Sequence, residues 1–321
     1  MNNRNTYEQL MFQMKVSELY FLEGYDQQKI GKVLGCSTST VSRALKSARQ
    51  NGIVEVRIKN PLKEARDIAN KLKEKYSLKK VIVVRGIYSE PQTFRKAIGI
   101  AAAELAGNIL EDGHIVGISS GRTIYEMIKS LHLFSKDLDI EVIPLLGGMG
   151  IVETKFQINE LSRMFANNFS GKSKVLNVPI VVKEKKTHDL LMEEKGTKEI
   201  TNIWKKLDIV FVAIGPPASV LPPLISNYSN LSKDEENLIQ SNAVGDICGR
   251  FFDKDGNECK TNVSQRIISI DFKLLKKVPC RVGIAGGKEK VDGIRGALSK
   301  GLINILVTDE ETAKSVLRRT K

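Results

Sequence analysis

Short apolar runs alternate with amphipathic stretches through most of the chain, from Lys80 to the C-terminus. The apolar runs are nearly continuous, as in strands buried on both faces of a parallel sheet. We predict strands at residues 81–84, 115–119, 140–146, 175–182, 209–214, 266–270, 281–285 and 303–308. We predict helices at residues 94–110, 121–131, 155–169, 233–241, 288–298 and 310–318. This alternation indicates a doubly wound, mainly parallel α/β domain with helices on both faces of the sheet.

The pattern changes before residue 60, where two short helices joined by a tight turn are predicted. Asp26 can cap the first helix, which covers residues 27–34, and Ser37 or Thr38 can cap the second, which ends at residue 49. Gly35 suits the turn because positive φ costs glycine little. The small Gly31 lets the two helices approach closely. This spacing is typical of a helix-turn-helix.

The alternation over residues 53–58 predicts a strand directly after the second helix, in the position of a wing. A winged helix-turn-helix places its second helix in the major groove, where hydroxyls, amides and long cations reach phosphates and base edges. The residues expected to do so are Gln27, Gln28, Ser37, Thr38, Ser39, Thr40, Ser42, Arg43, Lys46 and Arg57. An ordinary three-helix bundle is the alternative, but spacing, caps, wing and charge together favour DNA binding.

Positive charge is concentrated near the N-terminus. The chain has 50 Lys+Arg and 37 Asp+Glu, a net charge of +13, and residues 27–59 contain seven basic residues and one acidic residue. A basic end on a nearly neutral body is typical of a protein that binds a polyanion, although Lys-rich surfaces also serve solubility. The charge therefore agrees with a DNA-binding N-terminus without proving it.

A helical segment separates the two patterned regions. Leu62, Ala65, Ala69, Leu72 and Tyr76 recur at alternating intervals of three and four residues, which is a stripe of two heptads. The stripe could form a dimer seam or lie on the large domain as a connector, and so short a stripe slightly favours the connector. We expect a DNA-binding domain at 1–59, a linker helix at 60–78 and an effector and oligomerisation domain at 79–321.

Three loops that follow predicted strands are candidates for binding a phosphate. Ser119, Ser120, Gly121, Arg122 and Thr123 combine hydroxyls, a guanidinium and backbone N–H groups at a helix start. Gly147 and Gly148 would let a ligand approach the backbone, and Gly287 and Lys288 would add a glycine turn and a cation. Packing alone explains many such glycines. None of the loops matches a P-loop or a dinucleotide-binding fingerprint.

A fourth element, residues 245–252, contains an acid and a base. Asp246 could accept hydrogen bonds from sugar hydroxyls, and Arg250 could add charge to the site or only pair locally. A buried aspartate that caps a turn explains the same residues equally well.

The remaining composition excludes several classes of protein. The four cysteines are scattered without a C-x-x-C pair and there are three histidines, so we expect no metal site and no cofactor. The first fifteen residues lack the apolar core of a signal peptide, and no apolar run approaches the length of a membrane span. These features lead us to expect a cytoplasmic protein.

Five segments form a more specific combination than any single motif. They are residues 27–45 of the predicted helix-turn-helix, 118–123, 245–252, 285–288 and 301–310. Together they resemble the SorC family of bacterial sugar-responsive transcription regulators, over roughly residues 15–318.

The resemblance implies a winged helix-turn-helix joined to an α/β effector domain similar to sugar-phosphate isomerases and deaminases. It implies a homotetramer that acts as a repressor at the operator of a carbohydrate catabolic operon, with a phosphorylated sugar as effector. Gly121, Arg122 and Thr123 would hold the phosphate, Lys288 would complete its charge, and Asp246 would bind sugar hydroxyls.

Three departures from the family pattern alter the expected effector site. Ser120 stands where many members have Trp, and Leu146 stands where some carry Lys or Arg before the glycine pair. The third departure is Ser264-Gln265-Arg266, where the family has Asn-Asp-Arg, and it bears on sugar specificity. The second departure removes a covalent or second-phosphate anchor, which makes a bisphosphate effector less favoured.

An enzyme is the alternative function, a sugar-phosphate isomerase or deaminase with an added nucleic-acid anchor. Such chemistry needs a positioned base and a ring-opening acid. Asp246 and His114 are the candidates, but His114 precedes its strand and falls at the wrong end of the sheet. We therefore expect a regulator and not an enzyme.

Overall fold

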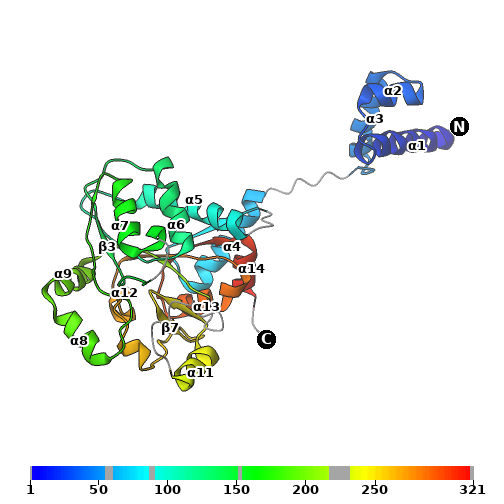
Figure 1. Cartoon of the computed structure of the whole chain (residues 1–321). Helices are drawn as coiled ribbons and strands as arrows, with labels where there is room; N and C mark the ends of the chain where they lie inside the picture. The colour runs from blue at the N-terminus through cyan, green and yellow to red at the C-terminus, as the bar shows by residue number, and fades with distance from the viewer. Residues whose placement is uncertain (1, 55–60, 87–90, 151–153, 217–231, 319–321) are drawn as a thin grey trace. The chain divides into compact units, whose positions relative to one another are not determined.

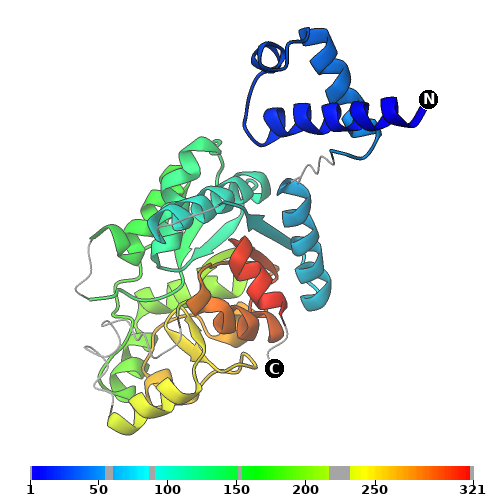
Figure 2. The same ribbon diagram turned by 90° about the vertical axis from the view of Figure 1, so that its right-hand side faces the viewer.

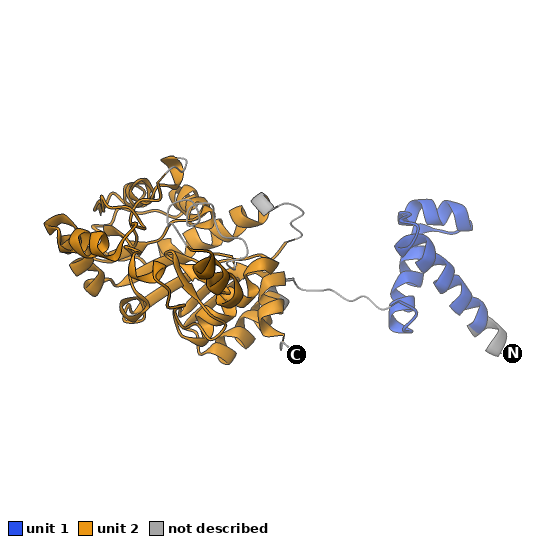
Figure 3. Cartoon of the chain, turned by 60° about the horizontal axis from the view of Figure 1, so that its bottom comes forward, with its two compact units in different colours: residues 1–60 blue, residues 61–321 orange. Residues whose placement is uncertain are grey.

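The computed structural model divides the chain into two compact units, residues 1–60 and residues 61–321 (Figure 3). It describes residues 2–54, 61–86, 91–150, 154–216 and 232–318. We call the first unit the head and the second the large unit. Each has a hydrophobic core of its own.

The head is built from three helices, α1 (Asn2–Phe21), α2 (Gln27–Leu34) and α3 (Thr38–Gln50). Its core consists of Val16, Leu19, Ile30, Val41, Ala44 and Leu45. The two predicted helices are confirmed with boundaries within one residue, whereas α1 was not predicted. Ile53 and Val54 follow α3 outside any strand, and the rest of the predicted wing lies outside the described residues.

Helix α4 (Pro61–Tyr76) belongs to the large unit. Leu72 is fully buried in the core of that unit, and Ile68 and Tyr76 pack against it. The helix contacts β1 (Lys80–Val84) and α14 (Glu310–Leu317). This packing agrees with a connector laid on the large domain, because Ala65 and Leu72 of the apolar stripe are buried within the chain.

A seven-stranded, wholly parallel sheet forms the centre of the large unit, in the order β1-β9-β8-β5-β2-β3-β4. The strands other than β1 are β2 (Ile115–Ile118), β3 (Glu141–Pro144), β4 (Lys172–Ser173), β5 (Ile209–Ala213), β8 (Cys280–Ile284) and β9 (Ile305–Asp309). The predicted fold class, a mainly parallel α/β domain, is confirmed.

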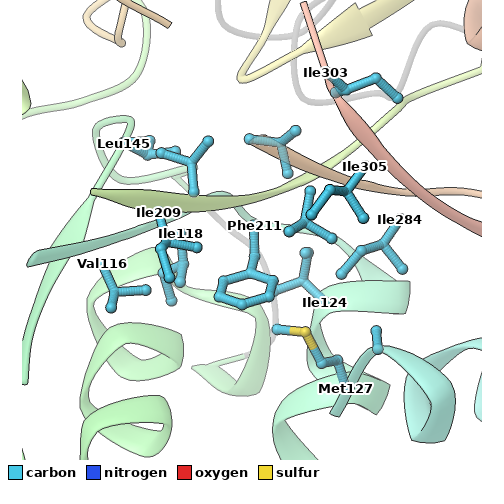
Figure 4. Packing of buried hydrophobic residues seen from close by; sticks show 14 of the residues in the cluster. Val116, Ile118, Ile124, Met127, Leu145, Ile209, Phe211, Ile284, Ile303 and Ile305 are labelled. Carbon is cyan, nitrogen blue, oxygen red and sulfur yellow. The ribbon is translucent and has the colours of Figure 1, made fainter. Parts of the chain in front are cut away.

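Helices cover both faces of this sheet. One group is α5 (Pro91–Ile109), α6 (Arg122–Ser130) and α7 (Ile158–Asn167), and the other includes α4, α13 (Val291–Ser299) and α14 (Figures 1 and 2). Phe211 of β5 points toward Ile124 and Met127 of α6, and all three are fully buried (Figure 4). Each such side chain contributes about 1.5–3 kcal/mol by leaving water.

Two predicted strands are wrong. Residues 266–270 are buried and residues 175–182 alternate between exposed and more buried positions, but both segments make only isolated bridges, such as Val181 with Ile267 and Leu146 with Ser269. Val181 and Ile267 pack with Val263 in a small cluster beside the main core. An apolar run shows that a segment is buried, and does not show which neighbour accepts its hydrogen bonds.

Several short elements were not predicted. They are α8 (Lys185–Glu193), α9 (Lys195–Ile203), α12 (Phe272–Leu275) and an antiparallel hairpin of β6 (Gly245–Ile247) and β7 (Arg250–Phe252). Helix α11 (Lys233–Asn242) was predicted, and a capping box between Ser232 and Glu235 fixes its start. Among the described residues, no helix is both long and apolar enough to cross a membrane.

Candidate functional site

The chain changes direction across the sheet between β2 and β5, and we call the carboxyl edge of the sheet at this point the crevice. From β2 the chain continues outward to β3 and β4, whereas from β5 it continues in the opposite direction to β8 and β9. In open parallel sheets ligands bind at such a switch point, beyond the carboxyl ends of the strands. Residues 119–123 follow β2 and residues 214–216 follow β5, so both loops border this crevice.

The loop after β2 leads directly into the N-terminus of α6. Gly121 is the N-cap residue with φ 144°, and α6 receives no side-chain cap. Its first-turn N–H groups and the positive end of the helix dipole therefore face the crevice without a capping side chain. Arg122 is exposed at the first position of the helix and Thr123 is buried at the second. This geometry suits an anion.

Ser119 and Ser120 are engaged within the protein. The Ser119 hydroxyl accepts a hydrogen bond from the Ala213 N–H at 2.9 Å and donates to the Ser120 carbonyl, which extends the contact between β2 and β5. The Ser120 hydroxyl donates to the Met149 Sδ at 3.2 Å. The Ser119 hydroxyl therefore bonds within the protein, and its expected contact with an effector stays a prediction.

Asp246 lies at the same crevice because the β6–β7 hairpin is anchored there. The Gly215 N–H donates to the Asp246 carbonyl at 2.9 Å, and a Cβ at Gly215 would stand 1.7 Å from the Asp246 Oδ1. Only glycine fits at position 215. The Asp246 Oδ2 accepts the Gly249 N–H, yet burial raises the pKa of the carboxyl to about 6, against the opposing effects of that hydrogen bond and of Lys290.

The cation whose charge is coupled to Asp246 is Lys290, which the sequence analysis missed. Burial lowers the pKa of the Lys290 ammonium, Glu289 and Asp246 act to raise it, and Arg95 and Arg122 act to lower it. These couplings place Lys290 within electrostatic range of one carboxylate of the crevice and two guanidinium groups. Lys288, which we expected here, lies two residues earlier in the 3₁₀ turn of residues 288–290, and its side chain is exposed, so its expected contact with the effector stays a prediction.

Three cations therefore gather at the crevice around one buried acid. Arg122 is exposed and Arg95 is half-buried. Like charges held close together are unfavourable without a counter-ion. An anion with several oxygens, such as a phosphate, would satisfy the guanidinium groups and the ammonium together.

Gly147 and Gly287, in the loops after β3 and β8, have structural roles that the sequence did not reveal. A Cβ at Gly147 would stand 2.5 Å from the Val178 carbonyl, so the chain itself occupies the space expected for a ligand. The Gly287 N–H donates to the Asp309 carboxylate and to the Thr312 hydroxyl, which fixes the loop to the start of α14. At Gly148 a Cβ would make only ordinary van der Waals contacts, the nearest with the Val178 carbonyl at 3.7 Å, so this glycine is not required by packing.

Arg250 is a structural residue, and its expected role in binding an effector is wrong. The side chain is buried, and its five N–H groups donate to the Glu258 carboxylate and to four backbone carbonyls. Those carbonyls belong to Ser264, Ile267, Ser269 and Ile270. A guanidinium has five donors, so none remains for a ligand.

The helix-turn-helix of the head is built by local interactions. The Asp26 carboxylate accepts the Lys29 N–H and caps α2, and the Ser37 hydroxyl accepts the Thr40 N–H and caps α3. Gly35 has φ 66° in the turn. A Cβ at Gly31 would stand 2.8 Å from the Cys36 carbonyl, so glycine is needed for the close approach. The predicted caps and glycines are confirmed.

Helix α3 presents a polar surface opposite the core of the head. Ser39, Ser42, Arg43 and Lys46 are exposed, while Val41, Ala44 and Leu45 are buried. Ser37 lies within hydrogen-bond distance of the Ser39 and Thr40 hydroxyls, so these three order the start of the helix. Gln28 and Thr38 are also exposed and Gln27 is half-buried, whereas Arg57 lies outside the described residues. The surface has the residue types that read a major groove.

The residues expected for enzymatic chemistry do not come together. The Nδ1 of His114 accepts the Glu111 N–H just before β2, at the amino end of the strand. Asp246 lies at the carboxyl end of the sheet, as its bond to Gly215 shows. Among the described residues, no three or more His, Cys, Asp or Glu side chains could hold a metal ion.

Ionisation of Asp246 should make the large unit less stable as the pH rises. The folded-state pKa of about 6 lies above the ordinary aspartate pKa of 3.8, so the folded protein binds this proton more tightly than the unfolded chain. The resulting stabilisation is present at low pH and is lost between about pH 4 and 6. We expect Asp246→Asn to gain about 2 kcal/mol relative to the native protein between pH 4.5 and 6.5. Urea unfolding of both proteins checks this, and a difference that is independent of pH would contradict it.

Comparisons with known proteins agree with this arrangement. The family described as "Putative sugar-binding domain" matches residues 60–318. The sorbitol operon regulator of Klebsiella pneumoniae is 32% identical over 95% of this chain and 97% of its own. The deoxyribonucleoside regulator of Bacillus subtilis is 28% identical over 97% of this chain and 98% of its own.

Solved structures show the same similarity. The crystal structure of the full-length sorbitol operon regulator SorC from Klebsiella pneumoniae has a TM-score of 0.75 at 30% identity, covering 96% of this chain and 98% of that one. The probable sor operon regulator from Shigella flexneri has a TM-score of 0.73 at 32% identity, covering 79% of this chain and 100% of that one.

Proposed function

The chain belongs to the SorC family of transcription regulators, and on that premise we propose that a phosphorylated sugar controls how tightly it binds operator DNA. The relatives are named as regulators and not as enzymes. The observation that carries the effector class is the group of Arg95, Arg122 and Lys290 beside Asp246 at the switch point. Cations with one buried acid suit a ligand that has both a phosphate and hydroxyl groups.

The groups of the crevice divide into two parts by their chemistry. We assign the phosphate to the N-terminus of α6 with Gly121, Arg122 and Thr123, and to the charge of Arg95 and Lys290. Asp246 accepts hydrogen bonds from sugar hydroxyls, and Ser120 and Gly148 line the wall near Met149. Such a site requires the phosphate, because a free sugar leaves the cations without a partner.

The protein has one state that can bind DNA and one that cannot. The effector acts by binding these two states with different affinities. We propose that the chain works in the cytoplasm as a homotetramer that represses a carbohydrate catabolic operon. The exposed polar face of α3 reads the operator, and binding in the large unit alters how the subunits hold the heads.

A thermal-shift screen against sugar phosphates and their unphosphorylated parents tests the proposed effector. A ligand at 100 times its Kd adds about 2.7 kcal/mol of stability. For a domain of this size that is a rise in Tm of several degrees, at about 2–4 °C per kcal/mol. We expect one phosphorylated sugar to raise the Tm while its parent does not. A shift by free sugars only, or by none of the compounds, would contradict the phosphate site.

Replacing Arg43 tests the DNA-binding surface. Arg43→Ala should weaken binding by about 5- to 150-fold, the effect of losing a base or phosphate contact of about 1–3 kcal/mol. The probe is a duplex selected by the native protein from a random pool, and binding is measured by fluorescence anisotropy. Arg163→Ala, which removes an exposed guanidinium of the large unit, is the control for net charge. Equal affinities of the two variants would refute this placement of the recognition helix.

A further inference from the structure

A Lys-Lys pair precedes or opens three strands of the parallel sheet. Residues 79–80 lead into β1, residues 205–206 end the 3₁₀ turn before β5, and residues 276–277 follow α12 just before β8. Because the strands are parallel, all of them start at the same edge of the sheet. The three pairs therefore lie at the amino edge, opposite the crevice. We call these six lysines the basic edge.

Hydrogen bonds tie the segments of the basic edge together. The Pro279 carbonyl accepts the Lys79 ammonium at 2.9 Å and the Asn304 side-chain amide at 2.8 Å, which joins the starts of β8, β1 and β9. The Cys280 N–H donates to the Asp208 carbonyl at 3.1 Å, which joins β8 to β5. These four strands are neighbours in the order β1-β9-β8-β5. At about 4.8 Å between strands, the basic edge extends over roughly 14 Å.

The lysines of the basic edge are exposed and lack acidic partners. In the described ranges of the chain, none of the six is part of an ion pair. The start of β3, on the other half of the same edge, differs, because there Lys174 pairs with Glu141 at 3.2 Å. Unpaired like charges close together repel one another until a counter-ion is bound.

The acids of the adjoining segments do not balance this charge. The carboxylates of Asp112, Asp208 and Asp271 accept backbone N–H groups, which holds them within their own turns. Glu74 and Glu111 are exposed. The same segments carry further exposed lysines, which are Lys73, Lys75, Lys273 and Lys300. The basic edge therefore keeps a large positive charge from β1 to β5.

We propose that the basic edge binds the phosphate backbone of DNA that flanks the operator, as a second DNA contact in addition to the polar face of α3. Duplex DNA carries one negative charge per roughly 1.7 Å of its axis, so 14 Å of duplex carries about eight charges. Six ammonium groups on flexible side chains match such a charge density. Lysine contacts a phosphate as a point charge, so this contact adds affinity and no sequence specificity.

The covalent link between the two units favours DNA over an acidic protein as the partner. When the head holds its operator, the flanking duplex is present at a high effective concentration for the large unit. A contact that is weak by itself then adds to the affinity of the whole chain. An acidic protein has no such advantage, since nothing in this chain holds it nearby. The inference goes beyond the proposed function and does not involve the effector.

Two duplexes of different length test the proposal with the full chain. The short one, of about 20 bp, contains the site that the native protein selects from a random pool, and the long one adds about 20 bp of unrelated sequence on each side. The edge variant combines Lys80→Gln, Lys206→Gln and Lys277→Gln. The control variant makes the same change of charge at exposed lysines of α8, α11 and the loop after β7, with Lys186→Gln, Lys233→Gln and Lys260→Gln.

The edge variant should lose affinity for the long duplex only. We expect its Kd for the long duplex to rise at least about tenfold at 0.1 M salt, because three phosphate contacts are lost. The slope of log K against log salt should become less steep by about 2–3, at roughly 0.9 per contact. Its Kd for the short duplex should stay within about twofold of the native value, and the control variant should resemble the native protein on both duplexes.

Two results would overturn the proposal. Equal Kd values and salt slopes for the edge and control variants would show that the basic edge meets an acidic protein or only solvent. An equal loss on the short and long duplexes would show that the lysines act on the operator complex or on the fold. If the triple variant melts below the native protein, the three single variants replace it, each expected to reduce the slope by about one. Arg43→Ala weakens binding to both duplexes, so a failure of the recognition helix is read separately.

Discussion

Arg250→Met is expected to lower the free energy of unfolding of the large unit by about 3–5 kcal/mol, the usual effect of removing one partner of a buried charge pair. The guanidinium donates to the Glu258 carboxylate at 2.8 Å and to four backbone carbonyls between Ser264 and Ile270. Methionine fills similar space but donates nothing. The loss leaves Glu258 and the four carbonyls without this donor, in a segment that no sheet ladder holds.

Arg163→Met is the matched control for this experiment. Arg163 also forms a two-pronged ion pair, with Glu160, but on the surface of α7. Exposed pairs of this kind contribute about 0–1 kcal/mol. Urea unfolding of the two variants should therefore give very different midpoints. A similar midpoint for both would show that Arg250 is not a structural centre of the hairpin.

Lys290→Met should weaken binding of the sugar phosphate that raises the Tm by about 10- to 150-fold. A hydrogen bond to a charged group contributes about 1.5–3 kcal/mol, which corresponds to that range of Kd. Burial and the charges of Arg95 and Arg122 lower the pKa of the Lys290 ammonium at the crevice. Lys288→Met makes the same change two residues earlier, on an exposed side chain, and should alter the Kd by no more than about twofold.

A second measurement separates binding from folding in this pair of variants. The ammonium of Lys290 is desolvated and repelled by Arg95 and Arg122, although Asp246 and Glu289 attract it. Removing it relieves the repulsion and the desolvation, so the ligand-free Tm should not fall. Calorimetric titration gives the Kd of each variant. If Lys288→Met lost as much affinity as Lys290→Met, the cation of the site would be assigned to the wrong lysine.

The helix-turn-helix and the other local elements could be predicted from the sequence because the interactions that form them join residues close together in the chain. Asp26, Gly35 and Ser37 fix the helix-turn-helix by bonds that span three to five residues. The alternation of apolar strands and amphipathic helices likewise identified the parallel α/β class. The loop after β2 was found for the same reason, since a glycine between strand and helix marks a helix N-terminus.

What failed depended on partners distant in the chain. Residues 175–182 looked like a sheet strand, but their backbone groups bond to residues 148 and 266–268. Arg250 looked like a ligand-binding cation, but carbonyls 14 to 20 residues later occupy its donors. Gly147 looked open to a ligand, but Val178 fills the space.

The sequence by itself therefore determined the parallel α/β class of the large unit and the local structure of the helix-turn-helix. The tertiary structure alone decided which charged groups meet at the crevice. Lys288 and Lys290 lie in the same 3₁₀ turn after β8, and it is Lys290 whose charge is coupled to Asp246. Short-range bonds are set by neighbouring residues, whereas the gathering of Arg95, Arg122, Asp246 and Lys290 requires four segments to be folded onto one edge of the sheet.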